Sequence, residues 1–115
     1  MPRAFDEKEL LERVDNDWDF LGETVQMLAA DGPPLLQAIR RATESGDAPA
    51  VGRAAHALKG MIANFCSPGA HASASEVERL GNGGDLSAVP PALGALETGL
   101  GALIVDLNDF LATRA

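Results

Sequence analysis

Hydrophobic residues recur three or four positions apart in several long segments of the chain, which is the spacing of amphipathic helices. The clearest case follows Pro90-Pro91, where the spacing persists for about five turns and predicts a helix with one buried seam. No segment alternates between apolar and polar residues with a period of two, so we expect no β-strand. The predicted seam consists of Leu93, Leu96, Leu100, Leu103, Leu107 and Phe110.

Capping and turn residues divide the chain into one short helix and several longer ones. Asp6, Asn16 and Asp47 each precede a helical pattern, and we expect them to be N-caps. The segment 31–34 ends in two prolines, so we expect it to break or sharply kink the second helix. The expected helices are 6–14, 16–44 with its interruption, 47–65, 67–80 and 90–110.

Four long amphipathic segments joined by short connectors predict an antiparallel up-down four-helix bundle. The short first helix is expected to cap one end of it. The chain has 115 residues, which is enough for one domain with a single core. We therefore expect residues 1–115 to form a single all-α domain.

Composition limits the kinds of partner. The net charge is −8 and the nine Lys and Arg residues are scattered, so we expect neither nucleic-acid binding nor direct contact with an anionic membrane. We find no uninterrupted apolar run as long as a membrane span and no N-terminal signal segment, and the one cysteine cannot form an internal disulfide. These features indicate a cytoplasmic protein whose partner is another protein.

The central helix has one apolar side and one unusual outer side. His56 lies at the centre of the outer side, with Gly52, Gly60 and Ala63 one or two turns away. A glycine inside a helix costs roughly 1 kcal/mol relative to alanine, so these small residues indicate that another macromolecule approaches closely. The apolar side consists of Val51, Ala54, Ala55, Leu58, Met61, Ile62 and Phe65.

The residue types on the outer side fit anion chemistry. Histidine has a reference pKa of about 6.5, so an exposed His56 would be mostly neutral at pH 7 and would have one nucleophilic ring nitrogen. Lys59 lies three residues further on and so on the same face. Its ammonium group would stabilise an anion bound to that nitrogen.

These residues resemble a known motif. His56-Ala57-Leu58-Lys59-Gly60 is similar to the His-x-x-Lys-Gly signature of histidine phosphotransfer (HPt) domains, the intermediate carriers of multistep phosphorelays. The helical pattern is similar over residues 6–112. The chain departs from the family at Cys66, where many members have glycine, and at Met61 and Ile62, where small residues are usual.

The resemblance implies that His56 accepts a phosphoryl group from the aspartate of one receiver domain and passes it to the aspartate of another. Lys59 would stabilise the phosphoryl charge, and Gly60 would leave room for the receiver. The receiver would supply Mg²⁺, so the chain would be a phosphocarrier without a cofactor or autonomous catalysis. We expect a monomer, and we expect it to be the C-terminal module of a hybrid sensor kinase rather than a free-standing carrier.

Four further residues are expected to contact the partner: Gly52, Arg53, Ala63 and Asn64. For Arg53 a plain solvent-facing role is an equal alternative. For Asn64 the alternative is hydrogen bonding at the end of the helix.

Phe20 and Met27 on the second helix have two interpretations: they pack in the core, which we favour, or they flank His56 on the surface. The alternative function is an HPt-like binding module that recognises a regulatory partner without transferring phosphate. An exposed Phe20 and Met27 would favour such a binding role.

A metal site is the competing chemistry for the histidines. His56, Cys66 and His71 are the soft or borderline ligands of the sequence, and their spacing matches no compact zinc pattern. We therefore predict no metal site, and we expect His71 to be a solvent-exposed residue without a function.

Overall fold

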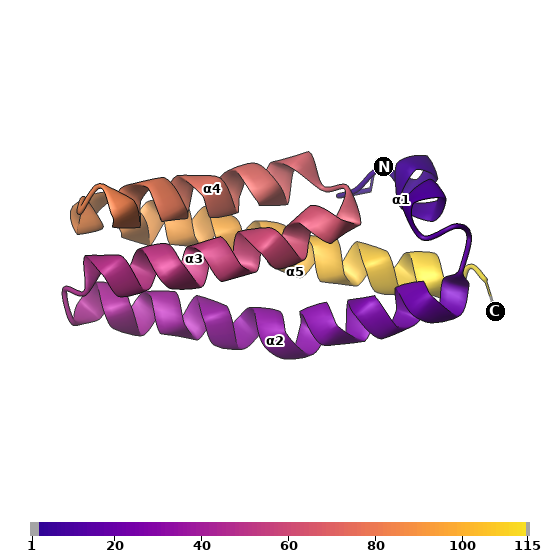
Figure 1. Ribbon diagram of the computed structural model, residues 1–115, viewed down its shortest axis with the longest axis horizontal. Helices are drawn as coiled ribbons and strands as arrows, with labels where there is room; N and C mark the ends of the chain where they lie inside the picture. The colour runs from indigo at the N-terminus through magenta and orange to yellow at the C-terminus, as the bar shows by residue number, and fades with distance from the viewer. Residues whose placement is uncertain (1–2, 115) are drawn as a thin grey trace.

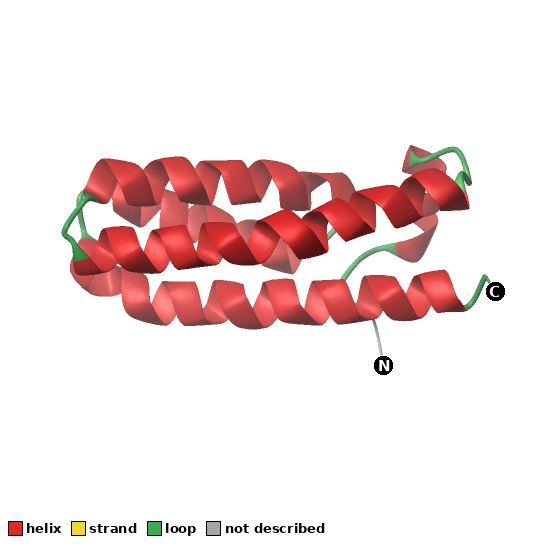
Figure 2. Cartoon of the chain, turned by 90° about the horizontal axis from the view of Figure 1, so that it is seen from below, coloured by secondary structure: helices red, strands yellow, loops and turns green. Residues whose placement is uncertain are grey.

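Four long helices form an antiparallel bundle in the computed structural model, which describes residues 3–114 (Figure 1). Every connector lies at one end of the bundle or the other, and the described residues contain no strand (Figure 2). The all-α up-down bundle predicted from the sequence is confirmed. The elements are α1 (Glu7–Arg13), α2 (Trp18–Glu44), α3 (Ala48–Ile62), η1 (Ala63–Phe65), α4 (Pro68–Asn82), η2 (Leu86–Ala88) and α5 (Val89–Ala112).

Aspartate side chains begin three of the helices. Asp6 accepts a hydrogen bond from the backbone N–H of Glu9, and Asp47 caps α3 in the same way, as predicted. The cap of α2 is Asp17 rather than Asn16, because Asn16 adopts a left-handed conformation with φ of 59° in the preceding turn. Asparagine and aspartate tolerate this conformation better than most residues.

The helix α2 is continuous across Pro33 and Pro34, so the predicted break is wrong. The two prolines lack an N–H and deprive the carbonyls of Ala29 and Ala30 of their helical partners. All four residues are exposed, so water can satisfy those carbonyls. Buried residues on both sides of the prolines hold α2 against the bundle, and Figure 1 shows the helix bowed near its middle.

The core runs the length of the bundle. All six predicted seam residues of α5 are buried, as is most of the predicted apolar side of α3. At one end α1 covers the core, where the Phe110 ring contacts Phe5 and Trp18 with centroids 5.3 and 5.0 Å apart. The backbone N–H of Asp6 donates to the carbonyl of Cys66, which ties α1 to the α3–α4 connector.

The segment Leu86–Ala112, which includes α5, is long and apolar enough to cross a membrane by length and composition alone. The leucine seam of α5 is buried in the bundle, while 28% of the most apolar 18-residue window is buried, and a single helix of this kind is weak evidence for a span.

The helices α3 and α4 approach most closely where glycine meets glycine. A Cβ atom on Gly81 would lie 2.6 Å from the backbone nitrogen of Gly52 and 2.9 Å from a methyl group of Val51. A Cβ on Gly52 would collide with the side chain of Asn82. Backbone atoms cannot move aside as a flexible side chain can, so this contact requires glycine at Gly81.

We predict that Gly81→Ala destabilises the bundle by about 1–3 kcal/mol, the usual cost of overpacking a tight contact. The free energy of unfolding in denaturant measures it. Gly22→Ala is the matched control, because a Cβ there meets nothing within 4 Å. The control should stabilise the protein, by up to about 1 kcal/mol, through helix propensity alone. Equal effects of the two substitutions would contradict the close contact.

Candidate functional site

His56 lies in the middle of α3 with its ring in solvent. Its side chain is 71% exposed, and Gly60, one turn further on, is exposed with nothing within 4 Å of an added Cβ. Arg53, Ala63 and Asn64 are also exposed. The structure therefore brings five of the predicted site residues to the surface, along about three turns of one helix and its 3-10 extension.

Gly52 does not belong to this surface, although we expected it to clear space beside His56. It is buried against α4, where it packs on Gly81 and Asn82. The helical wheel placed it on the outer side, as close to His56 as Gly60 is, but the position of α4 covers that part of α3. Gly52 permits a close contact within the bundle rather than with a partner.

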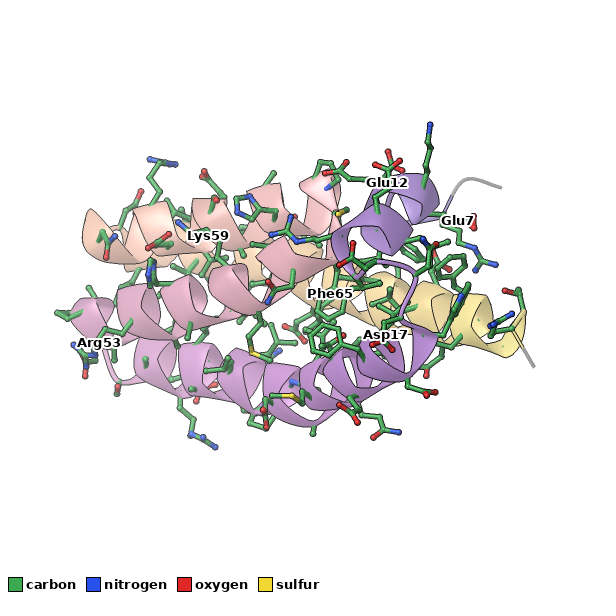
Figure 3. The ribbon with its side chains drawn as sticks, turned by 45° about the vertical axis from the view of Figure 1, so that its right-hand side comes forward. Glu7, Glu12, Asp17, Arg53, Lys59 and Phe65 are labelled. Carbon is green, nitrogen blue, oxygen red and sulfur yellow. The ribbon has the colours of Figure 1, made fainter. Side chains whose placement is uncertain are left out.

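Glu78 of α4 joins the site, and it was not predicted from the sequence. One of its carboxylate oxygens, Oε2, is 2.6 Å from His56 Nδ1, and the other, Oε1, is 2.5 Å from Lys59 Nζ. The Glu78 side chain is only 15% exposed, so α4 holds it in the groove beside α3. Figure 3 shows Lys59 on the side of α3 that faces α4.

The charge on Glu78 fixes the proton on the imidazole ring. A hydrogen bond from Lys59, with a smaller one from His56, lowers the pKa of the Glu78 carboxyl from its usual 4.5, against the opposing effect of desolvation. The group is ionised at neutral pH, and an ionised carboxylate only accepts hydrogen bonds. Nδ1 of His56 must therefore be the donor. In the neutral ring the lone pair is then on Nε2.

Lys59 is held differently from what its spacing suggested. We expected its ammonium group to lie where an anion bound to the ring nitrogen would sit, and the structure pairs it with Glu78 at 27% exposure. The three side chains thus form one chain of contacts, Lys59 to Glu78 to His56, across two helices. No local signal in the sequence identifies Glu78, because it is 22 residues from His56 and their contact depends on the register of α3 against α4.

Phe20 and Met27 are exposed, at 50% and 60%, so the favoured prediction that they pack in the core is wrong. Two shallow hollows lie along α2, and Thr24 and Asn64 line both. Phe20 lines one hollow and Met27 the other. Because the exposed Asn64, which follows α3, lines both hollows, this apolar surface borders the end of α3.

A third hollow, of about 290 Å³, lies where α1 covers the α3–α4 connector. It is lined in part by Cys66 and His71, with Asp6 and Glu9 from the α1 region. Burial, helped by Glu9, raises the pKa of the Cys66 thiol, so the thiol is protonated and a poor metal ligand at neutral pH. Within residues 3–114 no three His, Cys, Asp or Glu side chains are arranged to hold a metal ion.

Comparison with known proteins places this chain in a family. The model of the Hpt domain matches residues 23–105, a stretch that includes His56, Lys59 and Glu78. Among solved structures, histidine-containing phosphotransfer protein B (HptB) from Pseudomonas aeruginosa PAO1 is similar, with a TM-score of 0.88 over 98% of both chains. The two sequences are 18% identical, so this likeness concerns the fold. No curated protein matches the chain. With the family's model matching most of its length, the chain belongs to the Hpt domain family.

Proposed function

We propose that the chain is a phosphorelay intermediate. Nε2 of His56 accepts a phosphoryl group from the aspartate of one receiver domain and passes it to the aspartate of another receiver domain. The observation that supports this most directly is the hydrogen bond between His56 Nδ1 and Glu78. It leaves the outward nitrogen of an exposed ring with a free lone pair. The single free cysteine fits a reducing cytoplasm as the compartment.

The proposed transfer needs few catalytic groups from this chain. The Nε2 lone pair attacks phosphorus, the bond from phosphorus to the aspartyl oxygen breaks, and the carboxylate of the receiver leaves with that electron pair. The ring gains positive charge, which the Glu78 carboxylate stabilises from 2.6 Å. Transfer to the second receiver reverses these steps. The receiver supplies Mg²⁺ and its phosphate-binding residues, and the bundle contributes positioning.

The neighbours of His56 have separate roles in this proposal. Lys59 adds positive charge to the surface that the phosphoryl group approaches, and Gly60 and Ala63 leave the ring accessible. Arg53 and Asn64 contact the receiver at the two ends of the exposed face around His56. Phe20 and Met27 offer the apolar area that a docked receiver would cover, since large exposed apolar side chains mark interaction surfaces.

That apolar area also favours the second candidate, an HPt-like module that binds a regulatory partner without transferring phosphate. The two functions differ in what His56 must do. Transfer needs a nucleophilic Nε2, whereas binding needs only the surface around it. Substitutions that keep the surface and change the nitrogen therefore separate them.

We predict that His56→Gln abolishes labelling by a phosphorylated receiver domain, because the amide has no nucleophilic nitrogen. The phosphorylated site is mapped under conditions that preserve acid-labile linkages. His71→Gln is the control, since His71 is the other histidine of the chain and should leave labelling unchanged. Labelling that persists in His56→Gln would reject the proposed acceptor, and an unlabelled wild-type chain that still binds the receiver would favour the binding module.

We predict that Glu78→Gln slows labelling of His56 roughly tenfold, the rate equivalent of about 1.4 kcal/mol, because a hydrogen bond to a charged group contributes about that much. Single-turnover transfer from a phosphorylated receiver measures the rate. Glu76→Gln is the matched control, since Glu76 lies two residues away on α4 and pairs with Arg79 instead. A rate that Glu78→Gln leaves unchanged would contradict the assigned role in fixing the proton.

The same variant has a stability signature that depends on pH. Because the pKa of Glu78 is lowered in the folded chain, its contribution to stability is present above about pH 4.5 and is lost as the pH falls through the folded-state pKa. Wild type should be more stable than Glu78→Gln at pH 7 by about 0–1 kcal/mol. The difference in stability between wild type and Glu78→Gln should disappear in acid. A difference that persists in acid would instead indicate general misfolding of the variant.

We predict that Met27→Asp weakens binding of the receiver that labels His56 roughly tenfold, the usual loss for an interface anchor. Isothermal titration with the unphosphorylated receiver measures it. Gln26→Asp places the same side chain at the adjacent exposed position of α2 and is the control. If both variants bind as wild type does, Met27 lies outside the docking surface.

A further inference from the structure

The contact between Glu78 and His56 also constrains the ring after phosphorylation. A phosphoryl group on Nε2 uses the lone pair of that nitrogen, and the neutral form of such a ring has no proton on Nδ1. Nδ1 would then direct a lone pair at Oε2 of Glu78, which is 2.6 Å away and belongs to an ionised carboxylate. Two acceptors at hydrogen-bond distance repel each other. The geometry therefore disfavours the neutral form of the phosphorylated ring.

The structure holds this carboxylate in place. The Glu78 side chain is 15% exposed, and its other oxygen, Oε1, is 2.5 Å from Lys59 Nζ. The carboxylate is thus fixed on one side by an ion pair and on the other by the imidazole ring. The exposed ring can turn away from Glu78 only by giving up a charge-assisted hydrogen bond. Phosphorylated His56 is therefore expected to keep both this contact and the Nδ1 proton.

The other charged groups around His56 are weaker influences on its proton. Lys59 and Arg53, on α3 itself, are cations and oppose a positive ring, but Lys59 is already paired with Glu78 and Arg53 is exposed to water. The other ion pair of α4 in the described chain lies within that helix. The helix α2 also packs against α3, and its ion pair in residues 3–114 joins it to α5. The carboxylate in contact with the ring therefore has the largest effect.

We propose that Glu78 keeps the proton on Nδ1 while His56 carries the phosphoryl group, so that the phosphorylated ring is cationic and gives the group up readily. This inference rests on the proposed function and concerns the lifetime of the phosphorylated chain. Glu78 is a positioning residue here, because it acts through the imidazole and not on phosphorus. The chain is then a carrier with a short-lived phosphohistidine rather than a store of phosphoryl groups.

The proton matters because it changes the leaving group. When the phosphoryl group departs, an oxygen of the receiver aspartate or of water bonds to phosphorus, the bond to Nε2 breaks, and Nε2 keeps the electron pair. With water as the acceptor, its proton passes to solvent. A ring that is protonated on Nδ1 leaves as neutral imidazole, whereas a neutral phosphorylated ring must leave as an imidazolate anion or take up a proton during the step. With Glu78 in place, the ring needs no proton transfer on arrival or on departure.

The lifetime of the phosphohistidine tests the proposal without a receiver. Phosphoramidate phosphorylates histidine directly, and a His71→Gln background restricts loading to His56. After removal of phosphoramidate at about pH 8, Glu78→Gln should keep the phosphoryl group roughly tenfold longer than the parent chain. An ordinary imidazole, with a reference pKa of about 6.5, is protonated in only about 3% of molecules at that pH, and a glutamine amide also donates to an unprotonated nitrogen. Glu76→Gln is the matched control and should have the lifetime of the parent.

Two further readouts separate this role from a purely structural one. At about pH 5 an ordinary imidazole is mostly protonated by the solvent, so the lifetimes of the parent and of Glu78→Gln should converge there. The lifetime of the variant should therefore change with pH more than that of the parent. Nitrogen-15 NMR spectra of the ring at about pH 8 should show a proton on Nδ1 of phosphorylated His56 in the parent chain, and a loss of that proton in Glu78→Gln.

The outcomes distinguish this inference from the proposed function. Equal lifetimes of the parent and Glu78→Gln at about pH 8, or an unprotonated Nδ1 in the phosphorylated parent, would overturn the inference. A chain that phosphoramidate loads on His56 but that a phosphorylated receiver never labels would reject the proposed function. The lifetimes of the chemically loaded chains would still decide whether Glu78 holds the proton.

Discussion

The close approach of α3 and α4 is the constraint on which the site depends. Gly52 and Gly81 bring the two backbones together, and a Cβ on Gly81 would lie 2.6 Å from the nitrogen of Gly52. That separation lets a side chain as short as Glu78 reach across to His56. A wider spacing would leave the imidazole without a partner, and nothing in the described chain would then fix which ring nitrogen carries the proton. The contact between the two glycines thus positions the carboxylate that holds the proton on Nδ1.

Glu78 has a second consequence through Lys59. Glu78 divides its two oxygens between Lys59 and the ring. When the ring gains positive charge, the carboxylate can strengthen its bond to Nδ1 and release part of its hold on the ammonium group. The ammonium is partly exposed, so it can turn toward a new anion at little cost. Under the proposed function, the site without phosphate therefore already holds the positive charge that an arriving phosphoryl group would meet.

Sequence reasoning succeeded where the determining interactions are local. The seam of α5 and the caps Asp6 and Asp47 follow from spacing and side-chain chemistry within a few residues. It failed where the answer depends on a neighbouring helix. Glu78 was missed because only the register of α3 against α4 connects it to His56. Phe20 and Met27 were assigned to the core because an apolar side chain on a helix has the same pattern whether a neighbour or a partner covers it.

The glycines show the same limit of sequence reasoning, which does not know what a neighbouring helix covers, and the structure shows how to overcome it. The pattern alone treated Gly52 and Gly60 alike, yet one is buried in a helix contact and the other faces open space. Once the bundle is known, each helical glycine can be tested for whether an added Cβ would collide with the chain itself. Those that would collide, such as Gly81, are explained by folding. Gly60 would not collide, and it lies on the exposed face of α3 one turn from His56. Because its cost in helix propensity is not recovered inside the chain, that face is where a second macromolecule is expected to recover it.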